Sequence, residues 1–306
     1  MNGQCKSTLS GLALLVRVVV AVLCVAPAAS PAAEAAAPAP KLQALIITGH
    51  QNTEHDWRGM EVILRRMLEE TGRFEVRVTE EFRGATDETL APYDVVLINF
   101  HGKDRLLDPG EIRWGERAER ALFDFVKSGK GVVVYHSSFA MGDPSWPEFE
   151  HMAGAMLRFD AGSRRNPALD FPVDIVDRDD PITHGLRPQY VDVIDDMYVS
   201  MRWAPGEAIH VLATAFDDPK AYDAKAWPPR NYPLKLPARV EDLPGFGKVH
   251  PVVWTKRYGQ GRVYGFTLGH GPESMARPFI IGLLTRGTEW AATGQVTIPL
   301  PPLALR

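Results

Sequence analysis

The chain has 306 residues, of which 45% are hydrophobic and 24% are charged, and its formal net charge is −4. This composition is that of an ordinary globular protein, long enough for one large α/β domain or two small ones. The small negative charge, without a basic stripe on any expected helix or loop, argues against a nucleic-acid partner.

The first thirty residues carry the pattern of an export signal. Lys6 precedes the apolar run LSGLALLVRVVVAVLCVA, and small residues follow around Ala26–Ser30. We therefore predict a signal peptide over residues 1–30 and an exported, periplasmic protein with no membrane span after cleavage. Arg17 interrupts the apolar run. An uncleaved anchor is the alternative, because the run is just long enough to cross a bilayer.

The Pro- and Ala-rich residues 31–40 are expected to form a linker. Both cysteines, Cys5 and Cys24, lie in the leader before it. The mature protein would therefore have no thiol, and it could form no disulfide, no thiolate metal site and no cysteine nucleophile. Such a domain must be held together by its hydrophobic core, for which the remaining chain is long enough.

The first half of the mature chain alternates buried strands with amphipathic helices. Four strands and two helices are predicted, at residues 42–48, 74–79, 94–99 and 131–135 and at residues 57–71 and 111–127. This alternation predicts parallel strands joined by right-handed crossovers. A short helix over residues 149–156 is expected after the capping-box pattern Ser145-x-x-Glu148.

The second half is richer in strands. Five are predicted before a closing helix at 276–292, at residues 171–176, 190–201, 209–216, 250–255 and 262–268. Residues 217–247 show little periodicity, which is typical of a lid, a binding loop or an insertion. We expect one α/β domain over residues 41–296, with a mostly parallel sheet between two helical layers and extra strands in the second half. Residues 297–306 would be a C-terminal tail.

Histidine placement is the strongest functional signal. Five of the nine histidines fall just past predicted strand ends, namely His50, His55, His101, His136 and His270. Open α/β sheets bind ligands at the carboxyl ends of their strands, so we expect these side chains to line one cleft. Histidine titrates near neutrality and binds metals, which suits proton transfer or a metal site. Each histidine taken singly is also explained as a polar loop residue.

The stretch GVVVYHSS at residues 131–138 is the sharpest case. Its valines predict a strand buried on both faces, and the strand stops abruptly at His136. Elsewhere, the pair Asp195-Asp196 followed by Tyr198 can supply a general base or a metal ligand, although a solvated strand end is the alternative. Glu273, three residues after His270, either orients that imidazole or caps the last helix.

From these patterns we assign eight candidate site residues. The catalytic set is His136, His270 and Asp196, and the substrate-binding set is His50, His55, His101, Tyr198 and Glu273. The sequence does not fix which histidines would hold a metal.

Several of these segments together resemble the trehalose-utilisation (ThuA-like) family, which has the flavodoxin-like fold of the class I glutamine amidotransferases. The resemblance spans about residues 42–294. It lies in TGH after the first strand, KGVVVYHSS, DPITHGL at 180–186, DDMY at 195–198, the segment 250–270 and RGTEWAA at 286–292. It implies a role in the catabolism of disaccharides and their oxidised keto forms.

The resemblance also bears on two histidines. In the amidotransferases the turn after the central strand carries a cysteine nucleophile, and His136 occupies that neighbourhood here. Their His-Pro-Glu pattern is similar to His270-Gly-Pro-Glu273, which has one extra residue. Without the cysteine, glutaminase activity is not expected. The family usually shows Asp-Glu where this chain has Asp195-Asp196.

We therefore expect an exported sugar isomerase or lyase that moves a proton beside a carbonyl, assisted by a divalent metal such as Zn or Mn held by histidines. Its expected ligand is a small carbohydrate. Hydrolysis fits less well, because no second acid is evident. The alternatives are a non-catalytic carbohydrate-binding protein and a metal-binding module that assists a partner enzyme.

Overall fold

The structure is a computed structural model that describes residues 40–50, 55–101, 113–141, 146–167, 170–206, 208–222, 237 and 239–305. From Pro40 onward the chain forms one compact unit. The predicted leader and linker lie outside the described residues apart from Pro40. Residues 111 and 112 of the predicted helix also lie outside them, as do residues 223–236 and 238 of the stretch 217–247.

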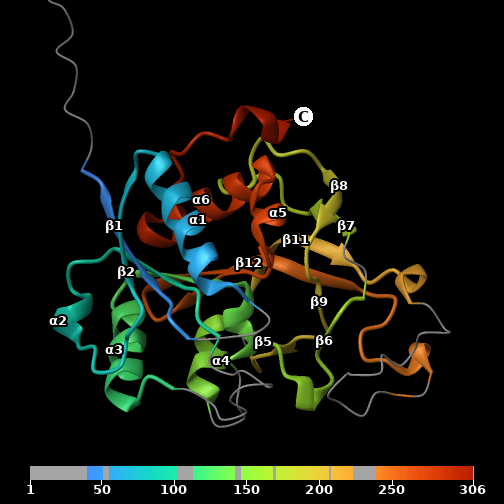
Figure 1. The fold of residues 1–306 in the computed structure, drawn as a ribbon, viewed down its shortest axis with the longest axis horizontal. Coiled ribbons are helices and arrows are strands. Elements are labelled where there is room, and N and C mark those ends of the chain that lie inside the picture. Colours follow the sequence, from blue (N-terminus) through green and yellow to red (C-terminus); the bar gives the residue numbers. More distant parts are fainter. Residues whose placement is uncertain are drawn as a thin grey trace, which may run out of the picture. The chain divides into compact units, whose positions relative to one another are not determined.

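A nine-stranded sheet forms the centre of this unit, in the order β2-β1-β3-β4-β13-β12-β11-β7-β8 (Figure 1). The first five strands in that order are parallel, namely β2 (Phe74–Thr79), β1 (Leu42–Ile47), β3 (Val95–Ile98), β4 (Gly131–Tyr135) and β13 (Gly261–Phe266). Four antiparallel strands extend it, namely β12 (Val249–Tyr258), β11 (His210–Phe216), β7 (Asp170–Ile175) and β8 (Gln189–Ile194). The expected α/β fold with extra strands in its second half is confirmed.

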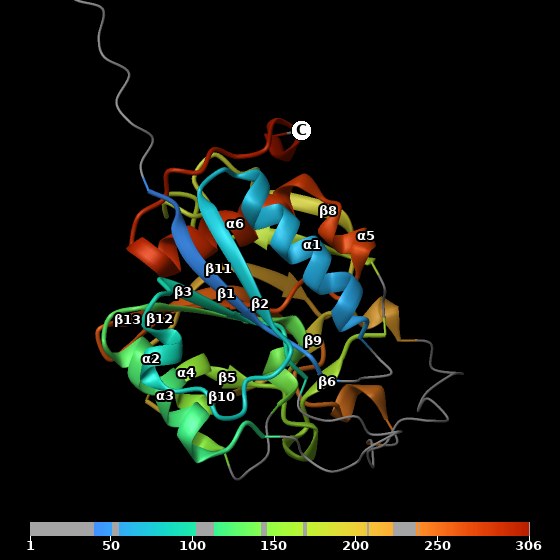
Figure 2. The ribbon, with the colours of Figure 1, turned by 60° about the vertical axis from the view of Figure 1, so that its left-hand side comes forward.

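Helices cover the sheet on both sides, as Figures 1 and 2 show. One layer contains α1 (Trp57–Glu70), α5 (Pro272–Met275) and α6 (Pro278–Thr293). The opposite layer contains α2 (Asp87–Leu90), α3 (Glu116–Lys127) and α4 (Pro147–Ala153). Each layer closes its own hydrophobic core against the sheet, so strands between them must be apolar on both faces. This explains the run of valines in β4, whose five residues are all buried.

The first helix forms where its sequence pattern predicts. Asp56 caps α1 by accepting a hydrogen bond from the backbone N–H of Gly59 at 3.0 Å. The apolar residues at helical spacing, among them Met60, Leu64 and Leu68, are buried against the sheet. The spacing therefore identified both the helix and its inner face.

Three predicted elements are interrupted in the structure. The helix predicted over 149–156 ends at Ala153, because Gly154 adopts a left-handed conformation (φ 85°) and the chain continues as β5 (Ala155–Met156). The predicted capping residue Ser145 lies outside the described residues. The closing helix is divided into α5 and α6, because a residue that precedes proline, here Arg277 before Pro278, is disfavoured in helical conformation.

The strand predicted over 190–201 is also divided, and this matters for the site. β8 ends at Ile194, and a separate strand β9 (Tyr198–Val199) pairs with β6 (Arg164–Arg165). Between them the Asp195 carboxylate accepts the backbone N–H of Asp196 at 2.8 Å, and it also accepts the N–H groups of Gly269 and His270, which follow β13. A further short strand, β10 (Arg202–Trp203), pairs with β5.

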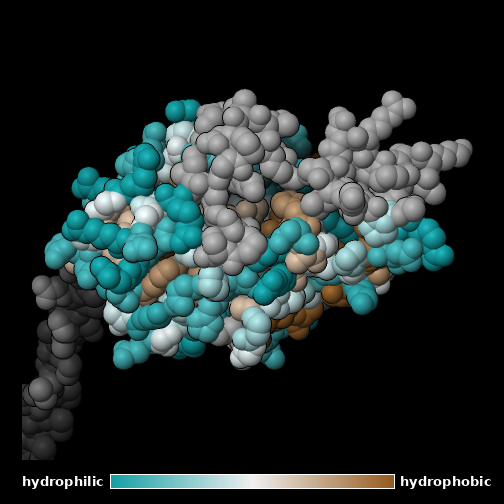
Figure 3. Space-filling view, turned by 90° about the horizontal axis from the view of Figure 1, so that it is seen from below, coloured by the Kyte–Doolittle hydropathy of each residue, from teal (hydrophilic) through white to brown (hydrophobic). Residues whose placement is uncertain are grey.

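The last residues of the chain pack onto the body of the protein. Ile298 and Ala304 are buried, and Tyr190 donates a hydrogen bond to the carbonyl oxygen of Ala304 at 2.6 Å. The face drawn in Figure 3 is largely hydrophilic, with smaller hydrophobic areas between its polar residues. Within the part of the chain that the structure describes, no helix is both long enough and apolar enough to cross a membrane.

Candidate functional site

The chain turns sharply at His136, where β4 ends. This residue has φ 37°, a conformation that is uncommon outside glycine, and it opens the 3₁₀ helix His136–Ala140. Ser138 holds the turn in place, since its hydroxyl donates to the carbonyl oxygen of Ile98 at 2.7 Å and accepts the N–H of Phe100 at 3.0 Å. Residues held in such conformations cluster at functional sites. His136 lies at the edge of the sheet, as predicted, because the backbone turns at this residue and Ser138 holds the turn.

The His136 ring is neutral and has a fixed tautomer. Its Nδ1 lies 2.6 Å from the carbonyl oxygen of Thr267, which can only accept, so Nδ1 carries the proton and Nε2 has a lone pair. The side chain is 1% exposed. Burial, reinforced by the neighbouring His270, lowers the pKa of His136 to about 3.

Asp195 positions His270 against this ring. The buried Asp195 carboxylate accepts the backbone N–H groups of Gly269 at 2.6 Å and His270 at 2.9 Å, and it also accepts the hydroxyl of Ser274. Gly269 has φ 98°, and a side chain there would collide with Tyr135, whose hydroxyl donates to the Gly269 carbonyl oxygen. Burial raises the pKa of Asp195, although these hydrogen bonds oppose the shift.

His55 completes a three-histidine cluster from the loop that precedes α1. Its ring centroid lies 5.3 Å from that of His136 and 4.9 Å from that of His270. One ring nitrogen of each of the three histidines lies within 4.8 Å of the other two. Burial, together with the adjacent His136, lowers the pKa of His55 well below its usual value, so this ring is also neutral near pH 7.

The geometry of the cluster fits a metal ion. Nε2 of His136 and Nδ1 of His270 are 3.2 Å apart. With metal–nitrogen bonds of about 2.0–2.1 Å, two nitrogen ligands of one ion stand roughly 2.9–3.4 Å apart at octahedral or tetrahedral angles. A histidine ligand usually donates its other ring N–H to a carbonyl or carboxylate, as His136 does to Thr267. The pair His136 and His270 therefore has the spacing of two ligands of one ion, and His55 offers a third ring nitrogen within 4.8 Å of both.

A carboxylate, a phenol and a guanidinium border the cluster. Asp196 Oδ2 lies 3.3 Å from Nδ1 of His270 and 2.9 Å from a guanidinium nitrogen of Arg165. Tyr198 stacks on His136 with ring centroids 4.9 Å apart, and its hydroxyl lies 3.2 Å from Nε2. Arg165 and Tyr198 face each other across the β6–β9 pair. The site thus combines lone pairs, a carboxylate base and a cation within one small volume.

The structure also places the remaining predicted residues. His101 stacks on His55 with ring centroids 5.2 Å apart, and its carbonyl oxygen lies 2.5 Å from Nδ1 of His50. All five predicted histidines are thereby gathered. Glu273 is not: it is exposed in the first turn of α5, and the carboxylate beside His270 comes from Asp196.

Sequence reasoning missed Arg165 and the Thr267 carbonyl. Arg165 comes from a two-residue strand, and such a strand leaves no alternation to detect. Every residue has a backbone carbonyl, so the sequence does not indicate which one contacts the site. The bend at Asp195 had a weak signal, because two adjacent acidic residues interrupt an otherwise apolar run.

Comparisons with known proteins agree with this architecture. The ThuA family, described as trehalose utilisation, matches residues 43–291. A ThuA-like protein from Parabacteroides merdae superposes with a TM-score of 0.67 at 24% identity, covering 86% of this chain and 94% of that one. A ThuA-like protein from Bacteroides uniformis gives 0.58 at 19% identity, covering 87% and 98%.

A cytoplasmic protein from Salmonella typhimurium gives a TM-score of 0.52 at 12% identity, covering 82% of this chain and 99% of that one. No curated protein matches the chain. At these identities the solved structures establish the fold, whereas the family match extends over most of the described domain. The chain therefore belongs to the ThuA family of trehalose utilisation and has a carbohydrate-related role.

Proposed function

We propose that this protein is a metal-dependent enzyme that moves a proton next to the carbonyl group of a keto-sugar. The observation that carries the proposal is the three-histidine cluster, whose ring nitrogens lie within 4.8 Å of one another beside Asp196. The family's carbohydrate-related role supports a sugar as substrate. Isomerisation and elimination both begin with this proton transfer.

The three histidines would hold a divalent ion. A set of imidazoles suits Zn, and the carboxylate of Asp196 beside them also suits Mn. When bound, such an ion would supply Lewis acidity that polarises the carbonyl oxygen of the sugar. The hydrogen bond from His136 to Thr267 orients one ligand before the ion arrives, and burial keeps that ring neutral.

Asp196 is the group placed to take the proton. It would remove hydrogen from the carbon beside the carbonyl, so that the electrons of that C–H bond form a carbon–carbon double bond and the carbonyl electrons move to oxygen. Return of the proton to the former carbonyl carbon, with transfer of the neighbouring hydroxyl proton to the former carbonyl oxygen, gives an isomer. Departure of an alkoxide from the next carbon, which takes the proton, gives elimination. Arg165 orients the carboxylate. The Tyr198 hydroxyl, which lies 3.2 Å from His136 Nε2, would be released toward the substrate oxygen once that lone pair binds the ion.

This assignment changes the role expected of two histidines. His136 and His270 were expected to carry protons, but the lone pair on His136 Nε2 and its distance to His270 suit metal ligation better. The proton-transfer role then falls to Asp196 alone of the three catalytic candidates.

The test uses single variants of the cluster. His136→Ala and His270→Ala should each lose bound metal and abolish turnover of a keto-disaccharide. The partly exposed His270→Ala should keep thermal stability nearly intact, whereas the buried His136→Ala should lose some. His151→Ala and His184→Ala, on exposed parts of α4 and of the turn after β7, are matched controls that should retain both properties. Unchanged metal content and turnover in both cluster variants would contradict the proposal. Calorimetric binding without any product would favour a non-catalytic carbohydrate-binding protein.

We also propose that the protein is exported to the periplasm, on the basis of the leader pattern in residues 1–30. Mass spectrometry of the protein from a periplasmic fraction should show an amino terminus near Ala26–Ser30. Recovery of the full-length chain in the membrane fraction would instead indicate an uncleaved anchor.

A further inference from the structure

A cavity lies between α2 and α3 at the amino edge of the sheet. Its volume is about 310 Å³, and its lining includes Lys130, which immediately precedes β4. Figures 1 and 2 both show α2 beside α3. His136 follows the other end of β4, so roughly 20 Å of strand separates Lys130 from the histidine cluster. Apolar cavities of about 150 Å³ hold benzene, so this one can accept a ring-sized group.

The inner wall of the cavity is apolar. Leu90 lines it from α2, Ala121 and Phe125 line it from α3, and all three side chains are buried. An apolar group that enters the cavity leaves water and contacts these side chains, which is favourable. The wall therefore favours a ligand with an apolar body.

The rim of the cavity is negatively charged. Asp87 of α2 and Asp124 of α3 line it, and both residues are exposed. Neither carboxylate has an ion-pair partner among the described residues. Lys130 also lines the cavity, but its ammonium lies 3.2 Å from the carboxylate of Asp94, which offsets its charge. Two carboxylates thus remain at the rim without a matching cation.

The carboxyl-terminal end of α3 adds to the negative potential. Ser128 caps this helix and lines the cavity. The backbone carbonyl groups at a helix C-terminus carry a partial negative charge, which favours a nearby cation. Lys127, the basic residue of the last turn, is engaged elsewhere, since it pairs with Glu148 at 2.7 Å and lies over the ring of Tyr258. The cavity therefore combines an apolar wall with an electrostatic preference for a positive charge.

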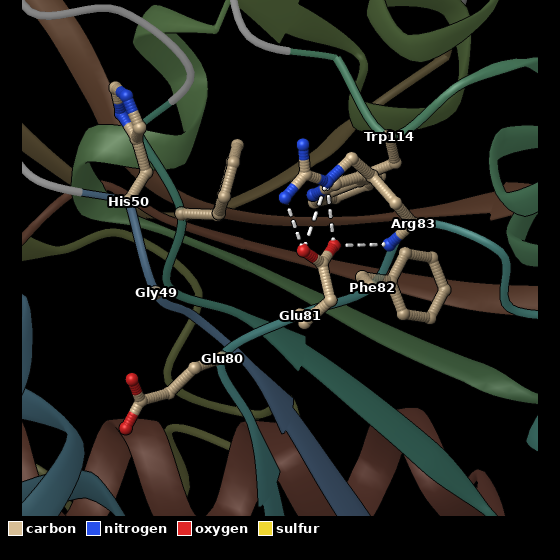
Figure 4. A pocket seen from close by; sticks show the side chains of 8 residues that line it. Gly49, His50, Glu80, Glu81, Phe82, Arg83 and Trp114 are labelled. Carbon is tan, nitrogen blue, oxygen red and sulfur yellow. Dashed lines mark hydrogen bonds and ion pairs between the residues drawn. The ribbon is translucent and has the colours of Figure 1, made fainter.

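A second cavity, at the carboxyl edge of the sheet, lacks this combination. It has a volume of about 110 Å³, and the Glu81 carboxylate in its lining accepts hydrogen bonds from Nε of Arg83 at 2.8 Å and 3.0 Å (Figure 4). The hydrogen bonding to Arg83 lowers the pKa of Glu81 to about 2, so the charge of this carboxylate is already matched. Glu80 also belongs to the lining, but Figure 4 shows its carboxylate pointing away from that pair. The smaller volume and the matched pair make this cavity the weaker cation site.

We propose that the cavity between α2 and α3 binds a small organic ammonium ion with an apolar body. The ammonium group would lie at the rim near Asp87 and Asp124, and the body would lie against Leu90 and Phe125. A carboxylate accepts charge-assisted hydrogen bonds from an ammonium group, and these are about twice as strong as neutral ones. The cavity lies outside the histidine cluster, so the inference does not depend on the reaction proposed there.

The test is calorimetric binding of benzylamine and of benzyl alcohol to the full-length protein at neutral pH and low salt. The two probes share the ring, but only benzylamine is positively charged. We expect benzylamine to bind at least about tenfold more tightly, which is the gain expected for one hydrogen bond to a charged group. High salt should reduce this gain, because the rim is exposed to solvent. In NMR spectra, the amide signals of Ala91 and Ser128, which line the cavity, should shift on binding.

Variants of the lining separate the two parts of the ligand. Asp124→Asn should lower the preference for benzylamine several-fold, and the double variant with Asp87→Asn and Asp124→Asn should bind both probes equally. Ala91→Leu, at an exposed lining residue, should weaken the binding of both probes, because the larger side chain fills the cavity. Metal content should stay at the wild-type value in all of these variants.

Glu116→Gln is the matched control, because Glu116 is exposed in the first turn of the same helix and does not line the cavity. It removes one negative charge and should keep the wild-type preference. Equal binding of the two probes by the wild type, no binding of either, or an equal loss in Glu116→Gln and Asp124→Asn would overturn the inference. So would amide shifts at Phe82 and Arg83 of the smaller cavity in place of those at Ala91 and Ser128.

Discussion

Two adjacent arginines of β6 belong to two different polar networks. Arg164 is 1% exposed and donates to Asp217 at 2.7 Å and to the hydroxyl of Tyr222. Arg165 is 32% exposed and donates to Asp196 beside the histidine cluster. Successive side chains of a strand point to opposite faces, so one short strand serves both networks. Asn166, the next residue, returns to the first network by donating to Asp217.

The difference between the networks shows how structure and function are divided here. Asp217 is fully buried and accepts from Arg164, Asn166 and Tyr222, so its charge is matched by donors within the protein. At the cluster, by contrast, the lone pair on His136 Nε2 has only longer contacts of 3.2 Å, to the Tyr198 hydroxyl and to His270 Nδ1, which a ligand can replace. The hydrogen bonds of the Asp217 network stabilise the folded chain. The histidine cluster, by contrast, can form further bonds to a ligand.

The largest expected effect comes from breaking the structural network. Arg164→Ala would leave the buried carboxylate of Asp217 without its cation, which costs about 3–5 kcal/mol. Urea unfolding should show this loss in the free energy of unfolding. Arg165→Ala, one residue away, should cost less than about 1 kcal/mol, because its ion pair is partly exposed. Similar losses in the two variants would refute the division between the networks.

The next effect concerns the residue that positions His270. Asp195→Asn replaces an acceptor with an amide donor that faces the backbone N–H groups of Gly269 and His270. We expect the affinity for Zn to fall about 10–100-fold, as is usual when a group that orients a ligand is changed. Metal titration with a competing chelator measures it. Asp174→Asn, in β7 and hydrogen-bonded to Gln189, is the control and should bind metal like the wild type.

A smaller effect is expected at Arg165. Arg165→Lys keeps the positive charge but loses the planar guanidinium that orients Asp196. Turnover of a keto-disaccharide should fall about tenfold, the loss expected for one hydrogen bond to a charged group. Metal content and stability should not change. If turnover instead remained at the wild-type rate, Arg165 would have no positioning role.

The sequence predicted the long elements and the convergence of histidines, but not the way in which the site is completed. Apolar runs such as that of β4 and the helical spacing in α1 are local signals, and tertiary packing agrees with them. The partner of His270 depended on a bend at Asp195 that the apolar pattern of β8 concealed. Arg165 reaches the site only through pairing of β6 with β9, a long-range contact that residue spacing does not encode.

The smallest expected effect tests the structural network by pH. His250 accepts from the N–H of Ser200 and donates to the carbonyl oxygen of Gly245, so its ring is neutral in the folded protein. Burial lowers the pKa of His250 below its usual value, with Asp217 opposing the shift and Arg164 reinforcing it. Below about pH 6.5 His250 is therefore protonated in the unfolded chain but still neutral in the folded chain. The free energy of unfolding falls as the pH falls.

His250→Gln keeps a donor for Gly245 and removes this titration. In a chelating buffer, the slope of the unfolding free energy between about pH 7 and pH 5.5 should become shallower by less than one proton, because a single group accounts for it. Urea unfolding at several pH values measures the slope. A steeper slope in the variant would mean that His250 binds its proton more readily in the folded chain than in the unfolded chain. The charge of Asp217 would then not be fully matched by Arg164 and its other donors.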